Sequence, residues 1–208
     1  MEKIDIPKRT VYRLSLYQRC LQKFLEQSVD TVSSDDLASA AGVKSTQLRK
    51  DLGYVGQFGT RGLGYSVETL SAAISGVMGL SMLQPVVLIG VGNLGAALIR
   101  YGGFRKEGFE IIAAFDAEPS NVKGPTEEMG VPVHHVSSLG DYVAEHAVRV
   151  GIVAVPESAG QEVTNILVES GIQAILNFSP AVLNVPEAVV VNHVDLAAEL
   201  GSLGFFVN

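Results

Sequence analysis

The sequence predicts an α/β protein in two parts, an N-terminal winged helix-turn-helix domain followed by a Rossmann-type doubly wound parallel sheet. Two observations carry this prediction. Residues 9–52 hold three short helical patterns and lead into a glycine-rich segment, as in a winged helix. From residue 86 onward, short apolar runs alternate with helical patterns, which is typical of parallel strands covered on both faces.

The charge of the chain divides in the same way. The net charge is −7, yet residues 1–65 hold ten Lys and Arg against seven Asp and Glu, while the rest holds five against fifteen. Only the first part therefore suits an anionic partner. The sequence shows no signal peptide and no run of 18 apolar residues, and its single cysteine, Cys20, can form no internal disulfide. We expect a cytoplasmic protein with no membrane partner.

The helices of the first domain follow from periodicity and capping residues. Apolar side chains recur at three- and four-residue steps over residues 9–27, which predicts one amphipathic helix. Ser33 or Ser34 is expected to cap a second, short helix that stops at Gly42. Ser45 is expected to cap a third.

The third helix carries candidate DNA contacts. Leu48 and Leu52 lie four residues apart and are expected to face the core, which turns the polar side chains outward. Glutamine pairs with adenine edges, arginine with guanine and lysine with phosphates, so this surface suits the major groove. A merely solvated helical face is the alternative. The candidate DNA-binding residues here are Lys44, Ser45, Thr46, Gln47, Arg49 and Lys50.

Glycines and aromatic residues alternate after the third helix, which predicts a β-hairpin with a thin tip, the wing. Arg61 lies between Gly59 and Gly62 at this tip and can enter the minor groove, where the potential is most negative. Helix, turn and wing in this order favour DNA binding. The wing candidates are Tyr54, Gly59, Arg61 and Gly62. A linking helix over residues 67–80 is expected to close the first domain, residues 1–82.

The second domain is expected to span residues 83–194. Unbroken Val, Ile and Ala runs separated by helical patterns predict a parallel sheet buried on both faces. The six expected strands lie at 86–90, 110–116, 130–134, 150–156, 173–178 and 188–192.

A G-x-G-x-x-G pattern follows the first of these strands and opens a helix. Its glycines turn the chain, let the backbone approach a pyrophosphate and pack the helix on the strand. Asp116 ends the next strand, 21 residues after Gly95, where a carboxylate holds the ribose 2′-hydroxyl and repels a 2′-phosphate. The sequence therefore predicts NADH or NAD⁺ as cofactor rather than its phosphorylated form. The loop candidates are Gly90, Val91, Gly92, Asn93, Leu94 and Gly95.

Two later loops are expected to border the same crevice, because ligands bind beyond the carboxyl ends of parallel strands. Their candidates are Val155, Pro156, Asn177, Phe178 and Ser179. For Pro156 and Asn177 an ordinary loop role is an equal alternative. The adjacent His134 and His135 would face opposite sides of a strand, and no metal site or catalytic residue is predicted.

Three segments together resemble the bacterial Rex family of redox-sensing transcriptional repressors. They are "RKDLGYVGQFGTRGLGY", "IGVGNLGAAL" and "ILNFSPAVLNVPEAVVVNHVDLAAEL". The resemblance implies a homodimer that binds palindromic operators and releases them when NADH rises relative to NAD⁺. It also implies that residues 195–208 form a helix exchanged between subunits, that Asp195 opens this helix, and that Tyr101 is the partner of Asp195 in redox switching. Asn93 stands where some members carry an arginine.

Two alternatives remain at this point. A small NAD-dependent dehydrogenase with a helical appendage would need a substrate pocket and a proton-transfer residue. Only seventeen residues follow Val191, and the chain has no Tyr-x-x-x-Lys pair. A module that binds coenzyme A or another dinucleotide in the same crevice is the other alternative.

Overall fold

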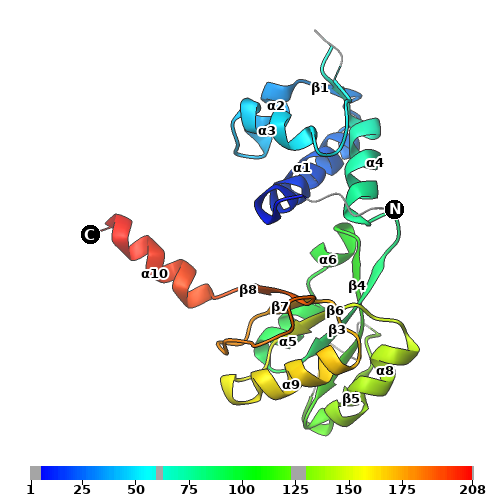
Figure 1. The fold of residues 1–208 in the computed structure, drawn as a ribbon, viewed down its shortest axis with the longest axis vertical. Helices are drawn as coiled ribbons and strands as arrows, with labels where there is room; N and C mark the ends of the chain where they lie inside the picture. Colours follow the sequence, from blue (N-terminus) through cyan, green and yellow to red (C-terminus); the bar gives the residue numbers. More distant parts are fainter. Residues whose placement is uncertain (1–5, 60–62, 123–129, 208) are drawn as a thin grey trace. The chain divides into compact units, whose positions relative to one another are not determined.

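The computed structural model describes residues 6–59, 63–122 and 130–207 of the 208-residue chain. Between Met82 and Leu83 the chain divides into two compact units (Figure 1). The first contains four helices among the described residues, and the second contains a six-stranded sheet with helices on its two faces.

The first unit has the helices that the sequence predicts. They are α1 (Lys8–Glu26), α2 (Ser34–Ala40), α3 (Ser45–Leu52) and α4 (Val67–Met78). Apolar side chains of all four meet in one core, which includes Leu14, Leu37, Leu48, Leu70 and Ile74.

The caps of the two short helices differ from each other. Ser33 caps α2, as predicted, by accepting a hydrogen bond from the Asp36 backbone N–H at 3.0 Å. The expectation that Ser45 caps α3 is wrong by one residue, because Lys44 has the extended backbone of the cap and Ser45 is already helical. The Ser45 hydroxyl instead accepts a hydrogen bond from Arg49, one turn further along.

The strand pairing of the wing also departs from the prediction. We expected both strands of a hairpin after Leu52, but residues 53–59 form turns and irregular backbone. The returning strand, β2 (Tyr65–Ser66), pairs antiparallel with β1 (Thr31–Val32), which lies between α1 and α2. Gly64 permits this pairing, because its φ is +84° and an added Cβ would meet the Val32 carbonyl group.

The second unit is built on a parallel sheet with strand order β5-β4-β3-β6-β7-β8. This order is that of the doubly wound dinucleotide-binding fold, with its reversal between β3 and β6. All six strands lie within or next to the predicted apolar runs. Their bounds are β3 (Gln84–Ile89), β4 (Phe109–Asp116), β5 (Val133–His135), β6 (Val150–Val153), β7 (Ala174–Asn177) and β8 (Val190–His193).

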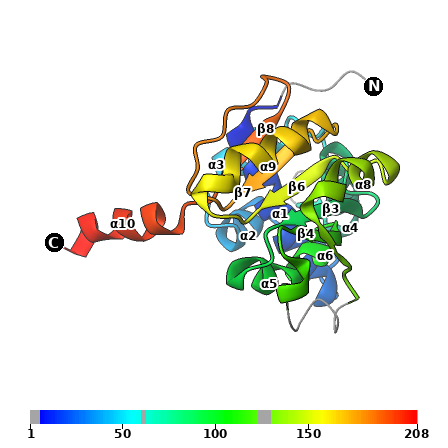
Figure 2. The same ribbon diagram turned by 90° about the horizontal axis from the view of Figure 1, so that it is seen from below.

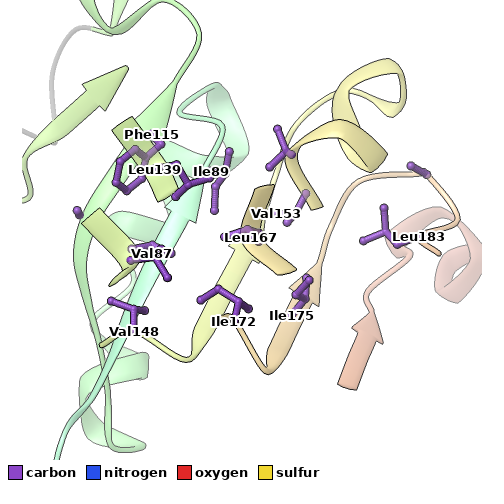
Figure 3. Packing of buried hydrophobic residues seen from close by; sticks show 14 residues of the cluster. Val87, Ile89, Phe115, Leu139, Val148, Val153, Leu167, Ile172, Ile175 and Leu183 are labelled. Atoms are coloured by element: carbon purple, nitrogen blue, oxygen red, sulfur yellow. The ribbon is translucent and has the colours of Figure 1, made fainter. Parts of the chain in front are cut away.

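Helices cover both faces of this sheet (Figure 2). On one face pack α8 (Leu139–Glu145) and α9 (Glu157–Glu169), and Figure 3 shows Leu139 and Leu167 among strand residues such as Val87 and Phe115. Val86 and Leu88 belong to the opposite cluster because successive strand residues point to opposite faces. That cluster includes side chains of α5 (Asn93–Ile99) and α6 (Gly103–Lys106). Two short 3-10 helices, η1 (Pro119–Asn121) and η2 (Val136–Ser138), follow β4 and β5.

The last helix, α10 (Leu196–Val207), has no buried residue. It follows β8 and is drawn in red in Figures 1 and 2. Leu200 is 71% exposed and Phe206 78% exposed, although most of the helix is apolar. An exposed apolar surface of this kind is typical of an interaction site.

Candidate functional site

The glycine loop joins β3 to α5, and each of its glycines has a different steric reason. Gly90 has a φ of +93°, and an added Cβ would lie 2.5 Å from the Ala154 carbonyl oxygen. At Gly95 an added Cβ would meet the Gly90 carbonyl oxygen, so the helix packs directly on the strand end. Gly92 caps α5 and has nothing within 4 Å of an added Cβ. The backbone at Gly92 therefore borders open space, and no side chain caps the first N–H groups of α5.

The Asp116 carboxylate lies beside this loop, at the end of β4. Its Oδ2 accepts a hydrogen bond from the Val91 backbone N–H at 2.8 Å, and its Oδ1 accepts one from the Glu118 N–H at 3.0 Å. These two bonds fix the carboxylate against the glycine loop. Each carboxylate oxygen has a further lone pair, so Asp116 can still accept hydrogen bonds from a ligand.

Asp116 and Gly92 line two hollows beyond the strand ends. One, of about 560 Å³, extends over α5 and the segment after β4, and the other, of about 400 Å³, reaches the loop after β6 and α9. The charged side chains lining them are all acidic. They are Asp116, Glu118 and Glu162, with no Lys or Arg among the described lining residues. Val155 and Pro156, both predicted from the sequence, line the second hollow.

The loop after β7 is organised by Asn177, whose side chain is fully buried. Its Nδ2 lies 3.1 Å from the carbonyl oxygens of Ser179 and Ala181, and its Oδ1 accepts from the Ser179 N–H at 2.9 Å. The same Nδ2 lies 3.0 Å from Nδ1 of His193, which must therefore be the acceptor of that pair. These bonds show that Asn177 shapes the loop, and its contact with a cofactor stays a prediction.

A third hollow, of about 480 Å³, lies between this loop and the start of α10. Phe178, Ser179 and Leu94 line it, as does Asp195. Oδ1 of Asp195 accepts hydrogen bonds from the N–H groups of Ala197 and Ala198 at 3.0 and 2.9 Å, which makes Asp195 the cap of α10.

Tyr101 follows α5 and is 58% exposed. Its ring contacts Phe104 edge-on, with centroids 5.1 Å apart. In the described residues of this single chain, no hydrogen bond joins Tyr101 to Asp195 or to Asn93. The redox-switching role implied by the resemblance therefore stays a prediction.

The candidate DNA-binding residues of the third helix lie on α3 and just before it, and several of their side chains are exposed. Thr46, Arg49 and Lys50 are exposed, whereas Leu48 is buried, as expected. Arg49 rests on the neighbouring helix, because its guanidinium donates to the Ser34 hydroxyl at 2.9 Å. Gln47 is half-buried, because its Nε2 donates a hydrogen bond to Asp51, and its contact with DNA stays a prediction.

Only part of the wing belongs to the described residues. Tyr54 is half-buried and Gly59 is exposed, with an added Cβ at Gly59 3.0 Å from the Tyr65 ring. Arg61 and Gly62, the predicted minor-groove tip, lie outside the described residues.

A buried carboxylate, Asp51, joins α3 to α1, and sequence reasoning missed it. Its side chain is 1% exposed and forms a two-pronged ion pair with Arg13, at 2.6 Å to Nε and 2.8 Å to one terminal nitrogen. Tyr17 and Gln47 donate to the same carboxylate at 2.8 and 2.9 Å, and Thr10 donates at 3.3 Å. The available signal was the position of Asp51 between the two inward-facing leucines, opposite an Arg and a Tyr four residues apart on α1.

These contacts shift the pKa values of the network so that Asp51 and Arg13 stay charged and Tyr17 stays neutral. Burial alone would raise the pKa of Asp51, but the hydrogen bonds from Arg13, Tyr17 and Gln47 hold it below its usual value. The hydrogen bond from Arg13 to Asp51 raises the pKa of Arg13. Burial and the hydrogen bond to the same carboxylate raise the pKa of Tyr17. The pair is therefore ionised throughout the physiological range.

Within the described residues, no group of three or more His, Cys, Asp or Glu side chains is placed to hold a metal ion. None of the described helices is long and apolar enough to cross a membrane.

Comparisons with known proteins agree with the division of the chain. A family model described as "Putative DNA-binding protein N-terminus" matches residues 5–53, and one described as "CoA binding domain" matches residues 83–181. The chain is 50% identical to the redox-sensing transcriptional repressor Rex of Streptomyces coelicolor, over 96% of this chain and 77% of that protein. It is 43% identical to the Rex of Pelotomaculum thermopropionicum, over 99% of this chain and 95% of that one.

Solved structures give the same picture. The structure of RSP with NAD⁺ and operator DNA superposes with a TM-score of 0.88 at 33% identity, covering 98% of this chain and 93% of that one. The structure of RSP with NADH gives a TM-score of 0.82 at 32% identity, and the match covers 98% of this chain and 94% of that one. A further structure describes RSP as a Rex-family repressor.

Proposed function

This chain belongs to the Rex family of redox-sensing transcriptional repressors, and we propose how its two units divide that function. The first unit binds operator DNA through α3 and the wing. The second binds NAD(H) at the glycine loop, and NADH favours release of the operator. One observation supports the assignment most strongly: Asp116, the carboxylate proposed to hold the ribose, accepts a hydrogen bond from Val91 of the loop proposed to hold the pyrophosphate.

The residues present fit NAD(H). The uncapped N–H groups of α5 and the open space at Gly92 suit a pyrophosphate, and the free lone pairs of Asp116 suit ribose hydroxyls. Among the described lining residues, the charged side chains are acidic, and they oppose a 2′-phosphate and also the 3′-phosphate of coenzyme A. NAD(H) is therefore favoured over coenzyme A, despite the description of the matching family model.

Signalling between the units requires a difference in affinity. NADH must bind the DNA-releasing arrangement more tightly than the DNA-bound one, because a ligand shifts an equilibrium only by its differential affinity. Operator DNA must then weaken NADH binding by the same factor. The dehydrogenase alternative has no support, since the relatives are named as repressors.

We propose that the working form is a cytoplasmic homodimer in which α10 packs on a second copy of the chain. The exposure of Leu196, Leu200 and Phe206 supports this, because apolar side chains of this size are costly to leave in water. A twofold dimer presents two recognition helices about one DNA turn, roughly 34 Å, apart, so its operator should be palindromic.

Fluorescence anisotropy of an operator duplex, first selected with the wild-type protein from a random library, tests the function. NADH should release the duplex at concentrations where NAD⁺ does not. Asp116→Ala should shift the NADH response to higher concentrations and keep DNA binding. Asp141→Ala is the control, because Asp141 is an exposed carboxylate on α8 outside both hollows. If neither nucleotide changes operator affinity in the wild type, the proposal is wrong.

A further inference from the structure

Gln47 differs from its neighbours on α3 in having one end of its side chain held by the protein. Its Nε2 donates to Oδ1 of Asp51 at 2.9 Å, one helical turn later. No hydrogen bond to its Oε1 is found within the part of the chain that the structure describes. The carboxamide is therefore anchored on one side only, on the helix that carries the candidate base contacts.

The anchor is rigid and can only accept. Asp51 is 1% exposed and is fixed by the two-pronged ion pair with Arg13 and by the Tyr17 hydroxyl. An ionised carboxylate offers no donor, so a carboxamide turned by 180° would place Oε1 against negative charge. One orientation of the Gln47 amide is therefore selected before any DNA arrives.

We propose that Asp51 is a positioning residue for operator specificity, which holds the Gln47 carboxamide in the orientation that leaves Oε1 and one N–H of Nε2 free to contact a base edge. The inference rests on the proposed function, because it requires α3 to enter the major groove. An acceptor and a donor on one carboxamide match N6 and N7 of adenine. We therefore expect one adenine in each half-site to be read by Gln47.

A purely structural role for Asp51 makes a different prediction. If the network only holds α3 against α1, its loss weakens binding to every DNA sequence alike. If it orients Gln47, its loss lowers discrimination at one base pair and leaves binding to unrelated DNA unchanged. The two roles are separated by the ratio of the protein's affinities for the cognate duplex and for a duplex with one substituted base pair. A structural defect lowers both affinities alike and therefore cancels in that ratio.

The test uses the full-length protein, the selected operator and duplexes that carry each single base-pair substitution. Gln47→Met keeps the side-chain length and removes the amide, and it should reduce discrimination at one base pair of each half-site by about 5- to 150-fold. Asp51→Asn should reduce discrimination at the same base pair, and the double variant should lose no more than Gln47→Met alone. Gln27→Met makes the same exchange at the exposed C-terminal end of α1 and should change nothing.

Asp51→Asn removes the charge that pairs with half-buried Arg13, so circular dichroism and thermal unfolding must first show that the variant is folded. If it is not folded, side-chain amide NMR of the wild type decides. One Nε2 proton of Gln47, assigned by its loss in Gln47→Met, should exchange with water more slowly than the other, because it is bonded to Asp51. Equally fast exchange of both protons would overturn the proposal, and so would unchanged discrimination in Gln47→Met or in folded Asp51→Asn. A wild type that shows the expected base pattern but no NADH response would refute the redox function and leave this inference standing.

Discussion

The glycine loop allows ligand binding and folding to be separated by two substitutions of the same kind. Gly92→Ala adds a methyl where nothing lies within 4 Å, at a φ of −69° and ψ of −165° that alanine adopts freely. Gly95→Ala adds the same methyl against the Gly90 carbonyl oxygen. The first methyl stands in the space proposed for the pyrophosphate, whereas the second lies inside the helix–strand contact.

The expected magnitudes differ accordingly. If the methyl at residue 92 costs one charge-assisted hydrogen bond to phosphate, about 1.5–3 kcal/mol is lost. This weakens NADH binding by about 10- to 150-fold, since 1.4 kcal/mol corresponds to a factor of ten. The melting temperature should fall only slightly, because alanine fits this backbone and is a poorer cap of α5 than glycine. For Gly95→Ala we expect overpacking to lower the stability of the second unit by about 1–3 kcal/mol.

Titration calorimetry with NADH and differential scanning calorimetry measure the two effects on the same samples. Operator binding without nucleotide should be unchanged in Gly92→Ala, because α3 lies in the other unit. Wild-type NADH affinity in Gly92→Ala would refute the placement of the pyrophosphate. A large drop in its melting temperature would show instead that the space at Gly92 is needed for folding.

Three further predictions concern the cofactor preference, the loop after β7 and the buried network. Asp116→Ala should weaken NADH binding and narrow its preference over NADPH, which competitive calorimetry measures; an unchanged preference would remove Asp116 from ribose recognition. Asn177→Ala should lower the free energy of unfolding by about 2–4 kcal/mol, because it leaves backbone groups of the loop unpaired; urea unfolding monitored by circular dichroism checks this. The pKa of Asp51 is lower in the folded protein than in the unfolded chain, where it is about 3.9. Ionised Asp51 therefore stabilises the first unit fully above that pH, and this stabilisation is lost as the pH falls through the folded-state pKa. Acid unfolding should therefore be steeper below about pH 4 in the wild type than in Asp51→Asn, and parallel curves would contradict the assignment.

Local patterns allowed much of this structure to be predicted. Apolar periodicity located α1 and the six strands, because a helix face or a buried strand needs only neighbours in sequence to be recognised. The glycine spacing and Asp116 predicted the loop between β3 and α5, because a fixed spacing after an apolar run can be recognised in the sequence alone. The recognition helix likewise followed from its leucine spacing and its exposed cations.

Contacts between distant segments could be found only in the tertiary structure. The pairing of β2 with β1 joins residues on either side of two helices, and no local pattern distinguishes it from a hairpin. Asp51 is an ordinary helical carboxylate in the sequence, and it becomes a buried anchor only because α1 brings Arg13 and Tyr17 against it. Asn177 likewise gained its loop role from carbonyl groups and a histidine that the fold gathers around it. The sequence alone determined which residues have the chemistry to bind DNA and NAD(H). Packing decided which polar side chains are held inside and which remain free to meet a ligand, because burial depends on the whole fold.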